Sequence, residues 1–588
     1  MAHNSRHMER DDIWGRLKQN TTPDVLVIGA GINGISVFRE LGLAGANVIL
    51  VDAADYCSGA SAALSRMVHG GLRYLENGEF RLVQESLMER NALLSNAPHY
   101  VKPLPTSIPI SSYFDGIIGS TLRFFRLSQS QPRRGALMIK AGLMFYDLFT
   151  RKNKVMPCHQ FFGKAATRQK FPQYRSETLC SATYYDASVT QPERLGFEII
   201  EQTLAENPAT LAINYTRATG RGDGEVILND ELSGQQAVVK PKTIINATGA
   251  WIDFTNDALT DEASSLKRRL IGGTKGSHLM IDNEELRKAI GDHMVYFENE
   301  EGRVCILFTY QGLVLVGSTD IRVENPTGMI CTQEEQDYIL KSLEGIFPNI
   351  KIAPEQIRFT FAGVRPLPHS NSAINGQISR DHSCVDLGSL AGGSAPVRCM
   401  VGGKWTTFRA FGEQVADAVL KDLGMKRTHS TLEARIGGGA AYPQTEAQRQ
   451  RWYQAVMSET GASQQRLETL LERYGTKARD VALACANQSD QPLVDAETYT
   501  HAEIAHLINA EHVANMLDLV LRRTTLAISG TLTTNTLEDI SRIFANQRGW
   551  DENLRQDHAT ETRNYLSAYH GMKQLIEDHI EMETSNVS

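Results

Sequence analysis

The 588-residue chain lacks several features that would assign it to a class at once. No stretch of about eighteen uncharged apolar residues exists, the length that a helix needs to cross a bilayer. Its eight cysteines form no C-x-x-C pair, so the sequence offers no metal site and no disulfide framework; free thiols in a reducing cytosol are expected. The N-terminal MAHNSRHMERDDIWGRL lacks the apolar core of a signal peptide, and part of it has the character of an expression leader.

The charge excludes one class of partner and suggests another. A net charge of −8 predicts no nucleic-acid binding. Residues 117–156, however, combine basic and apolar side chains with a single acid, Asp147. The basic ones are Arg123, Arg126, Arg133, Arg134, Lys140, Arg151, Lys152 and Lys154, and the apolar ones include Phe124, Phe125, Met144 and Phe145. Such a composition is typical of a surface that lies on anionic lipid, although a solvated basic face or a phosphate-attracting rim fits it equally.

The clearest motif is a glycine turn after an apolar run at residues 25–28. Its glycines, in G-x-G-x-x-G spacing, are Gly29, Gly31 and Gly34. In this motif the first glycine permits a tight turn, the second admits a pyrophosphate and the third lets helix and strand pack closely. A helix over 35–43 would direct its positive end at the phosphates. A second apolar run ends in Asp52, which would accept both ribose hydroxyls. The sequence thus predicts a dinucleotide site, without separating NAD from FAD.

Two later stretches extend this prediction. A strand over TIINATGAW, residues 243–251, ends in a turn at Thr248 and Gly249 that suits a backbone passing near a nucleotide. Another strand breaks at Gly402 and Gly403, and an amphipathic helix from 405–407 to 423 follows Lys404. A helix start with a cation suits negative charge developing on a cofactor ring, although a plain glycine turn with a surface lysine is the alternative. The spacing is not that of a P-loop.

Length and composition predict about two or three domains. A strand is also expected over GLVLVGSTD, residues 312–320. After a glycine-rich hinge at 436–440, helix formers and paired charges dominate from 444 to about 572. This change of composition predicts a separate helical domain at the C-terminal end.

Four stretches in a fixed order carry a family resemblance. They are LSRMVHGGLRYLENGEFRLVQESLMERNALLSNAPH at 64–99, KGSH at 275–278, AGVRPL at 362–367 and VGGKWTTFR at 401–409. Over about residues 22–550 the chain resembles the FAD-dependent, membrane-associated glycerol-3-phosphate dehydrogenases. The resemblance implies FAD rather than NAD. It also implies an α/β (mixed α+β) fold in which a Rossmann-like FAD domain of the glycine-oxidase type is interleaved with a β-rich substrate domain.

The resemblance also implies the domain boundaries. Within 22–430 the FAD domain would comprise about 22–72, 170–260 and 358–430, and the substrate domain about 73–169 and 261–357. A C-terminal helical domain would cover 431–572, with tails at 1–21 and 573–588. No metal is expected, and a homodimer is left open.

The implied activity is oxidation of sn-glycerol 3-phosphate to dihydroxyacetone phosphate, with hydride passing to flavin N5. His278 would take the hydroxyl proton, because imidazole exchanges protons near neutral pH, although its neighbour Lys275 leaves a purely structural turn open. Lys404 would stabilise the reduced flavin. The residues implied to bind phosphate or orient the polyol are Arg73, Tyr74, Arg365 and Arg380. Those implied to bind FAD, beyond the glycine motif and Asp52, are Ser65, Arg66, His69, Gly70, Thr248, Gly249, Gly403, Lys404, Thr406 and Thr407.

Members of the family lie on the inner face of the bacterial membrane and give electrons to quinone, so the resemblance implies a cytoplasmic, peripheral protein whose segment 117–156 contacts the membrane. Two departures stand out: Leu64, Ser65 and Arg66 replace the family's Ser-Ser-Lys, and the chain beyond about 550 is longer than usual. They leave open a longer substrate such as erythritol 4-phosphate. An enzyme that uses oxygen as acceptor is a further alternative. A flavin-binding regulator without turnover is a third alternative, against which the intact site residues argue.

Overall fold

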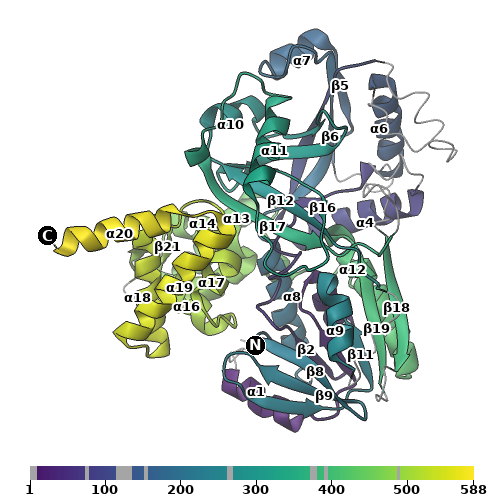
Figure 1. Cartoon of the computed structure of the whole chain (residues 1–588), viewed down its shortest axis with the longest axis vertical. Helices are drawn as coiled ribbons and strands as arrows, with labels where there is room; N and C mark the ends of the chain where they lie inside the picture. Colours follow the sequence, from purple (N-terminus) through teal and green to yellow (C-terminus); the bar gives the residue numbers. More distant parts are fainter. Residues whose placement is uncertain are drawn as a thin grey trace.

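The computed structural model describes residues 10–72, 79–113, 135–150, 156–260, 269–370, 381–389, 395–486 and 490–587, with the side chains of 148–150, 222 and 581–587 excepted (Figure 1). It contains a six-stranded sheet, a ten-stranded sheet, a three-stranded sheet and a group of C-terminal helices. The predicted α/β architecture with a C-terminal helical domain is therefore confirmed.

The six-stranded sheet has the order β18-β19-β11-β1-β2-β7 and is parallel except for β18. Its central strands are buried on both faces, which explains why their sequences are continuous apolar runs. Helices α2, α8 and α12 pack on one face, and α1 with the sheet β10-β9-β8 on the other. The strands are β1 (Val25–Ile28), β2 (Val48–Val51), β7 (Leu211–Ile213), β8 (Thr216–Gly222), β9 (Glu225–Asp230), β10 (Gln236–Val239), β11 (Thr243–Asn246), β18 (His382–Ser389) and β19 (Pro396–Gly402). The helices are α1 (Arg10–Gln19), α2 (Ile32–Leu43), α8 (Pro192–Glu206), α9 (Ile252–Ala258), the 3-10 turn η5 (Trp405–Thr407) and α12 (Phe408–Asp422).

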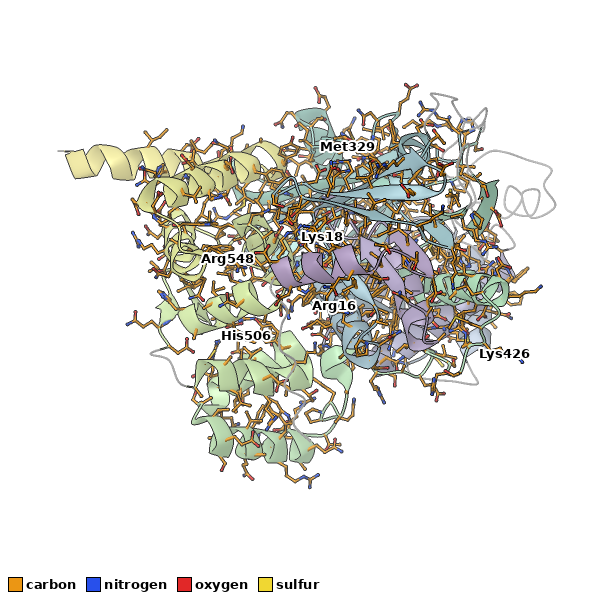
Figure 2. All side chains as sticks on the ribbon, turned by 90° about the horizontal axis from the view of Figure 1, so that it is seen from below. Arg16, Lys18, Met329, Lys426, His506 and Arg548 are labelled. Carbon is orange, nitrogen blue, oxygen red and sulfur yellow. The ribbon has the colours of Figure 1, made fainter. Side chains whose placement is uncertain are left out.

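Part of the expected N-terminal tail is ordered as α1. Its buried Trp14 and Leu17 join the core beneath β2 and β7. Seen from below, α1 lies across the outside of the molecule with Arg16 and Lys18 on it (Figure 2), and Lys18 donates a hydrogen bond to Gln235 at 2.8 Å. Apolar burial therefore attaches this segment to the sheet.

The ten-stranded sheet has the order β16-β12-β15-β14-β13-β4-β6-β3, with β17 paired to β12 and β5 to β6. Three of its strands, β3, β6 and β17, lie almost wholly in ranges that the resemblance assigned to the FAD domain. In the structure, β3 pairs with β6, β6 with β4, and β17 with β12. The strands are β3 (Met67–Val68), β4 (Val101–Ile110), β5 (Gln160–Phe162), β6 (Cys180–Val189), β12 (Thr274–Ile281), β13 (Met294–Glu298), β14 (Val304–Tyr310), β15 (Leu313–Gly317), β16 (Ile321–Arg322) and β17 (Ile357–Arg365). The flanking helices are α4 (Phe80–Asn96), α6 (Ala136–Thr150), α7 (Lys164–Lys170), α10 (Glu284–Ile290) and α11 (Gln333–Glu344).

The C-terminal helices pack against one face of the ten-stranded sheet. Leu315 and Phe359 of the sheet belong to the same hydrophobic cluster as Leu507 and Phe544 of the helices. The last helix, α20 (Gln574–Val587), forms where a tail was expected and extends away from the other helices (Figure 1). The remaining elements are α13 (Glu446–Thr460), α14 (Gln464–Tyr474), α15 (Ala478–Cys485), β20 (Pro492–Leu493), β21 (Ala496–Thr500), α16 (His501–Ala510), α17 (Met516–Asp518), a π-helical turn at Leu519–Arg523, α18 (Thr534–Arg548) and α19 (Glu552–His570). Within the described ranges, no helix has the length and apolarity to span a bilayer.

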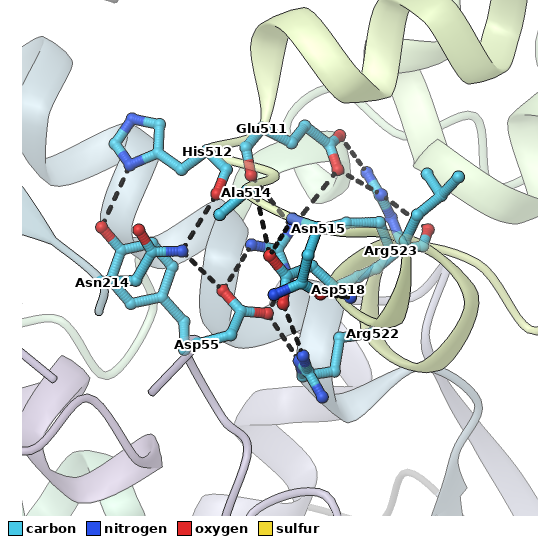
Figure 3. A network of polar contacts seen from close by, with 12 residues as sticks. Asp55, Asn214, Glu511, His512, Ala514, Asn515, Asp518, Arg522 and Arg523 are labelled. Atoms are coloured by element: carbon cyan, nitrogen blue, oxygen red, sulfur yellow. Dashed lines mark hydrogen bonds and ion pairs between the residues drawn. The ribbon is translucent and has the colours of Figure 1, made fainter. Parts of the chain in front are cut away.

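A buried polar network joins the C-terminal helices to the loop after β2 (Figure 3). Asp55 accepts hydrogen bonds from Arg522 Nε at 2.5 Å and from Arg523 Nη1 at 2.8 Å. Arg194 of α8 forms a bidentate pair with Glu511 at 2.7 and 2.8 Å. Burial alone would raise the pKa of Asp55, but the guanidinium groups of Arg523 and Arg522 lower it well below its usual range. The interface is therefore held by ionised groups.

Candidate functional site

The glycine turn between β1 and α2 has the close approaches that its spacing predicts. Gly29 has φ +102°, and a Cβ there would come within 2.7 Å of the Ala247 carbonyl at the end of β11. A Cβ on Gly34 would lie 1.9 Å from the Gly29 carbonyl oxygen. Gly31 is in extended conformation, and a Cβ there would lie 3.3 Å from Ser61 Oγ. The first and third glycines are thus needed for packing, and the second borders the start of α2.

Polar groups gather at the N-terminus of α2. Ser61 Oγ accepts a hydrogen bond from Ile32 N at 2.9 Å, and Asn33 Oδ1 is buried without a hydrogen-bond partner among the described residues. Ser61 was not among the site residues expected from the sequence. The run of small residues at 59–63, which lies beside the first glycine turn, is the sequence feature that could have indicated it. A helix start with an unsatisfied buried oxygen suits a polar ligand.

Asp52 ends β2 beside this turn. Its carboxylate accepts hydrogen bonds from Ala30 N at 2.6 Å and Ala54 N at 2.9 Å, and burial raises its pKa to about 6. Asp52 therefore holds the backbone of the glycine turn as well as lying where a ribose is expected. Across the turn, Thr248 Oγ1 donates to Asn246 at 2.6 Å, and Gly249 has φ +60°.

The second glycine turn lies against the first. Gly403 has φ +91°, and a Cβ there would be 3.2 Å from Asn33 Nδ2. Lys404 Nζ donates to Ser86 Oγ of α4 at 2.7 Å, so the cation lies between the turn and α4. Thr407 Oγ1 is buried and has no hydrogen-bond partner in the part of the chain that is described. The starts of α2 and of η5 thus border one region, as two helix N-termini around a single ligand would.

The loop before α4 meets this second turn. His69 N donates to Thr406 Oγ1 at 3.3 Å, and Gly70 N donates to Asp186 Oδ1 at 2.9 Å. Arg90 and Tyr146 also bond Asp186 Oδ1, at 3.0 and 2.6 Å. The HGG loop is therefore fixed on both sides, which positions its backbone next to residues 404–407.

His278 lies on β12, buried and stacked on Phe361 of β17 with ring centroids 4.8 Å apart and planes 10° apart. Its Nε2 lies 2.7 Å from Ser65 Oγ, and its Nδ1 is buried without a hydrogen-bond partner among the described residues. Burial, and then the charges of Arg365 and Arg66, lower the pKa of His278 to about 3. The imidazole is therefore neutral at pH 7 and can accept a proton.

Arg365 ends β17 next to the KGSH stretch. Its Nη2 donates to Ser318 Oγ at 2.7 Å, and a Cβ on Gly276 would lie 2.1 Å from the same nitrogen, so the guanidinium needs a glycine there. The side chain is 25% exposed, and its Nη1 lies 3.3 Å from Asp320 in an ion pair. Lys275, by contrast, is nearly buried, 2.6 Å from Glu335 in an ion pair. Both cations are thus ion-paired, and Arg365 is the more exposed of the two.

Ser65 and Arg66, neighbours in the stretch that departs from the family pattern, have different partners in the structure. Ser65 contacts His278, whereas Arg66 bonds Glu193 at 2.7 Å and lies over the Tyr310 ring at 5.6 Å. The Arg66 guanidinium thus has its partners in the interior, and the expected contact of this residue with the cofactor stays a prediction. Arg73, Tyr74 and Arg380 lie outside the described residues, as do 114–134 and 151–155 of the basic and apolar segment.

Taken together, the described residues fit a dinucleotide. Two glycine turns approach each other, each opening a helix, and Asp52 ends the neighbouring strand. Asn33 Oδ1 and Thr407 Oγ1 supply unsatisfied polar atoms there, and Lys404 supplies a cation. His278 and Arg365 lie on adjacent strands of the other sheet, β12 and β17.

Comparisons with known proteins agree with this geometry. The FAD dependent oxidoreductase family matches residues 24–417, and the C-terminal domain of alpha-glycerophosphate oxidase matches 429–555. The chain is 29% identical to glycerol-3-phosphate dehydrogenase of Synechocystis, over 94% of this chain and 98% of that protein. It is 27% identical to the aerobic glycerol-3-phosphate dehydrogenase of Bacillus subtilis, over 96% and 98%.

The fold has a solved counterpart. The structure of glycerol-3-phosphate dehydrogenase from Bacillus halodurans complexed with FAD superposes with a TM-score of 0.71 at 22% identity, covering 95% of this chain and 97% of that one. The match to the oxidoreductase family covers well over half of the chain. The chain therefore belongs to the family of FAD-dependent oxidoreductases, and over its whole length it resembles the glycerol-3-phosphate dehydrogenases.

Proposed function

We propose that the chain oxidises sn-glycerol 3-phosphate to dihydroxyacetone phosphate and passes the electrons to a membrane quinone. The observation that carries the proposal is the neutral, buried His278, whose Nδ1 has no hydrogen-bond partner in the described part of the chain, on the strand next to that of Arg365. The whole-length likeness to glycerol-3-phosphate dehydrogenases supports the choice of substrate.

His278 is proposed to take the proton of the substrate hydroxyl. When its Nε2 donates to Ser65 Oγ, the lone pair of Nδ1 is left to accept that proton. A phosphate dianion bound nearby would raise the low pKa of His278 and so favour the protonated product. The bound FAD supplies the hydride acceptor.

Arg365 is proposed to bind the substrate phosphate, because a guanidinium offers parallel donors to phosphate oxygens. Arg73, Tyr74 and Arg380 are proposed to complete this site by the family resemblance. Lys404 would stabilise negative charge that develops on the cofactor ring, and the N-terminus of α12 adds a favourable dipole.

Membrane contact is proposed through α6 and the segment around it. Leu137, Met144 and Phe145 of α6 are 56%, 59% and 56% exposed, and Lys140 is exposed beside them. The spacing of these residues places them on one side of the helix, opposite the buried Leu143 and Tyr146. An exposed apolar face with Lys140 beside it, in a segment whose sequence is rich in Lys and Arg, suits the inner face of an anionic bacterial membrane, where a quinone would also be reached.

Anaerobic reduction tests the substrate and the chemistry together. Glycerol 3-phosphate should bleach the visible flavin band of the purified holoenzyme, whereas His278→Gln should keep its FAD and bleach far more slowly. If only erythritol 4-phosphate bleaches the flavin, that compound is the substrate. Formation of hydrogen peroxide in air would identify oxygen as the acceptor. A flavin-loaded protein that none of the substrates bleaches would contradict the proposal and favour a binding role without turnover.

A further inference from the structure

The end of helix α19 covers an edge of the ten-stranded sheet at β17. Strand β17 pairs with β12 and with no second strand among the described residues. On its other side, His570 Nδ1 lies 2.9 Å from the Thr360 carbonyl oxygen, and Gly571 packs against the Thr360 side chain. Burial lowers the pKa of His570 to about 4, so the ring is neutral and its Nδ1–H donates to this carbonyl. His570 thus satisfies an edge carbonyl that would otherwise be unpaired.

The same ring begins a row of aromatic side chains that ends at His278. His570 stacks on Phe359 at 4.5 Å and 8° between planes. Phe359 lies 6.2 Å from Phe361, two residues along β17 on the same face of the strand. Phe361 stacks on His278 at 4.8 Å. Four rings therefore connect the C-terminal helices with the imidazole on β12.

The last ring in this row has little freedom to move. On the other side of the ring lies Gly317. A Cβ built on Gly317 would be only 2.2 Å from the Cδ2 of His278. His278 is thus held between Phe361 and the backbone of β15, while Ser65 fixes its Nε2. Because packed interiors transmit displacements rather than absorb them, a shift of Phe361 moves the imidazole.

We infer that His570 is a positioning residue for His278, so that residues beyond 550 set the geometry of the proton acceptor without touching the substrate. The inference rests on the proposed function of His278. It gives the last part of the chain a role that its sequence alone does not indicate. Helix α19 contacts the edge of β17, and the stacked rings of Phe359 and Phe361 connect this contact with His278.

Three variants of the holoenzyme test this. His570→Ala removes both the stacked ring and the hydrogen bond, and should slow anaerobic flavin reduction at saturating glycerol 3-phosphate by about tenfold or more, with FAD content unchanged. His570→Phe restores the stack and should recover most of the rate. His558→Ala is the matched control, since His558 is on the same helix and stacks on Trp550 at 4.2 Å, away from β17; its rate should equal that of the wild type.

Two further measurements separate this inference from the proposed function. In a His278→Gln background, His570→Ala should have no additional effect on reduction, because it acts through His278. A crystal structure of His570→Ala should show the His278 ring displaced, a readout that needs no turnover. A wild-type rate for His570→Ala, an unmoved His278 ring, or equal losses in the Ala and Phe variants that follow their thermal stability would each overturn the inference. Absence of reduction in the wild type would instead contradict the proposed function alone.

Discussion

Gly317 and His278 face each other across β15 and β12 so closely that a methyl group on Gly317 would lie 2.2 Å from the imidazole Cδ2. Real side-chain contacts are never this short. A side chain at position 317 and the observed position of the His278 ring therefore exclude each other. The imidazole occupies the space that a side chain at position 317 would need, and the neighbouring strand thereby dictates where the proposed proton acceptor lies.

Gly317→Ala should therefore displace His278. A shift of about 1 Å at a reacting group costs about 100-fold in rate, so we expect a loss of that order in the rate of flavin reduction. FAD content should stay that of the wild type. Gly163→Ala, which meets nothing within 4 Å, is the control. Wild-type reduction by Gly317→Ala would mean that the imidazole position is not critical.

Gly34→Ala should abolish FAD binding. Its Cβ would lie 1.9 Å from the Gly29 carbonyl oxygen, so α2 must move away from the glycine turn. We expect protein that is folded but nearly colourless, measured as the ratio of flavin to protein absorbance. Gly15→Ala places the same methyl group in open space on α1 and should keep its flavin. Full flavin content in Gly34→Ala would contradict the role given to the first turn.

Asp55→Asn should weaken the attachment of the C-terminal helices. Removing the carboxylate that both arginines share leaves Arg522 paired with Asp518 alone and Arg523 with the more distant Glu511. Breaking a buried ion pair costs about 3 to 5 kcal/mol, and the remaining partners set this variant towards the lower end of that range. Thermal unfolding followed by circular dichroism measures it, with the exposed Asp557→Asn as control.

The same variant should also respond less to acid. The folded-state pKa of Asp55 is lowered, so its contribution to stability is full above the unfolded pKa of about 3.9 and is lost as pH falls below it. Asp55→Asn should therefore lose less stability than the wild type on acidification in that range. A parallel pH response of the two proteins would show that Asp55 is not ionised in the fold.

His278 should make the wild type less stable at mildly acid pH. Its pKa falls from an ordinary 6.5 to about 3 on folding, so the unfolded chain binds the additional proton. Stability therefore declines as pH drops from about 6.5 towards 3, by about 2 kcal/mol for this group at pH 5. Between about pH 7.5 and pH 5, His278→Gln should lose less thermal stability than the wild type by this amount. The exposed His429→Gln should behave like the wild type; an unchanged slope in His278→Gln would mean that the imidazole is protonated in the fold.

Serine substitutions on α6 should weaken binding to anionic liposomes. Leu137→Ser, Met144→Ser and Phe145→Ser together remove the exposed apolar face, and cosedimentation should fall in a salt-sensitive manner because basic residues contribute to the same contact. Leu232→Ser, which changes another half-exposed leucine in the three-stranded part of the chain, is the control. Unchanged sedimentation of the triple variant would remove α6 from the proposed membrane surface.

Much of the fold was predictable because it depends on local patterns. The apolar run and glycines at 25–34 gave β1, its turn and α2, and the strands near 243–246 and 313–317 lie where β propensity indicates them. The break at Gly402 and Gly403 and the helix after it follow from glycine conformation and amphipathic spacing. These features involve neighbours within one turn or one strand.

The sequence could not indicate that β6 and β17 belong to the ten-stranded sheet, because the apolar pattern of a strand does not determine which strand it pairs with. Nor could it indicate that Arg66 turns inward to Glu193, or that Ser61 lies at the start of α2. These contacts join residues far apart along the chain, and only the packed structure decides which of them meet.

The amino-acid sequence by itself thus determined that the chain carries a dinucleotide turn, a second glycine turn with a lysine, and a helical C-terminal part, since each depends on short-range spacing. Only the tertiary structure decided that Lys404 reaches Ser86, that Asp55 lies between Arg522 and Arg523, and that His570 connects with His278 through two phenylalanines. The physical reason is that these contacts depend on how sheets and helices pack, and that packing is selected by the burial of the whole core rather than by any single segment.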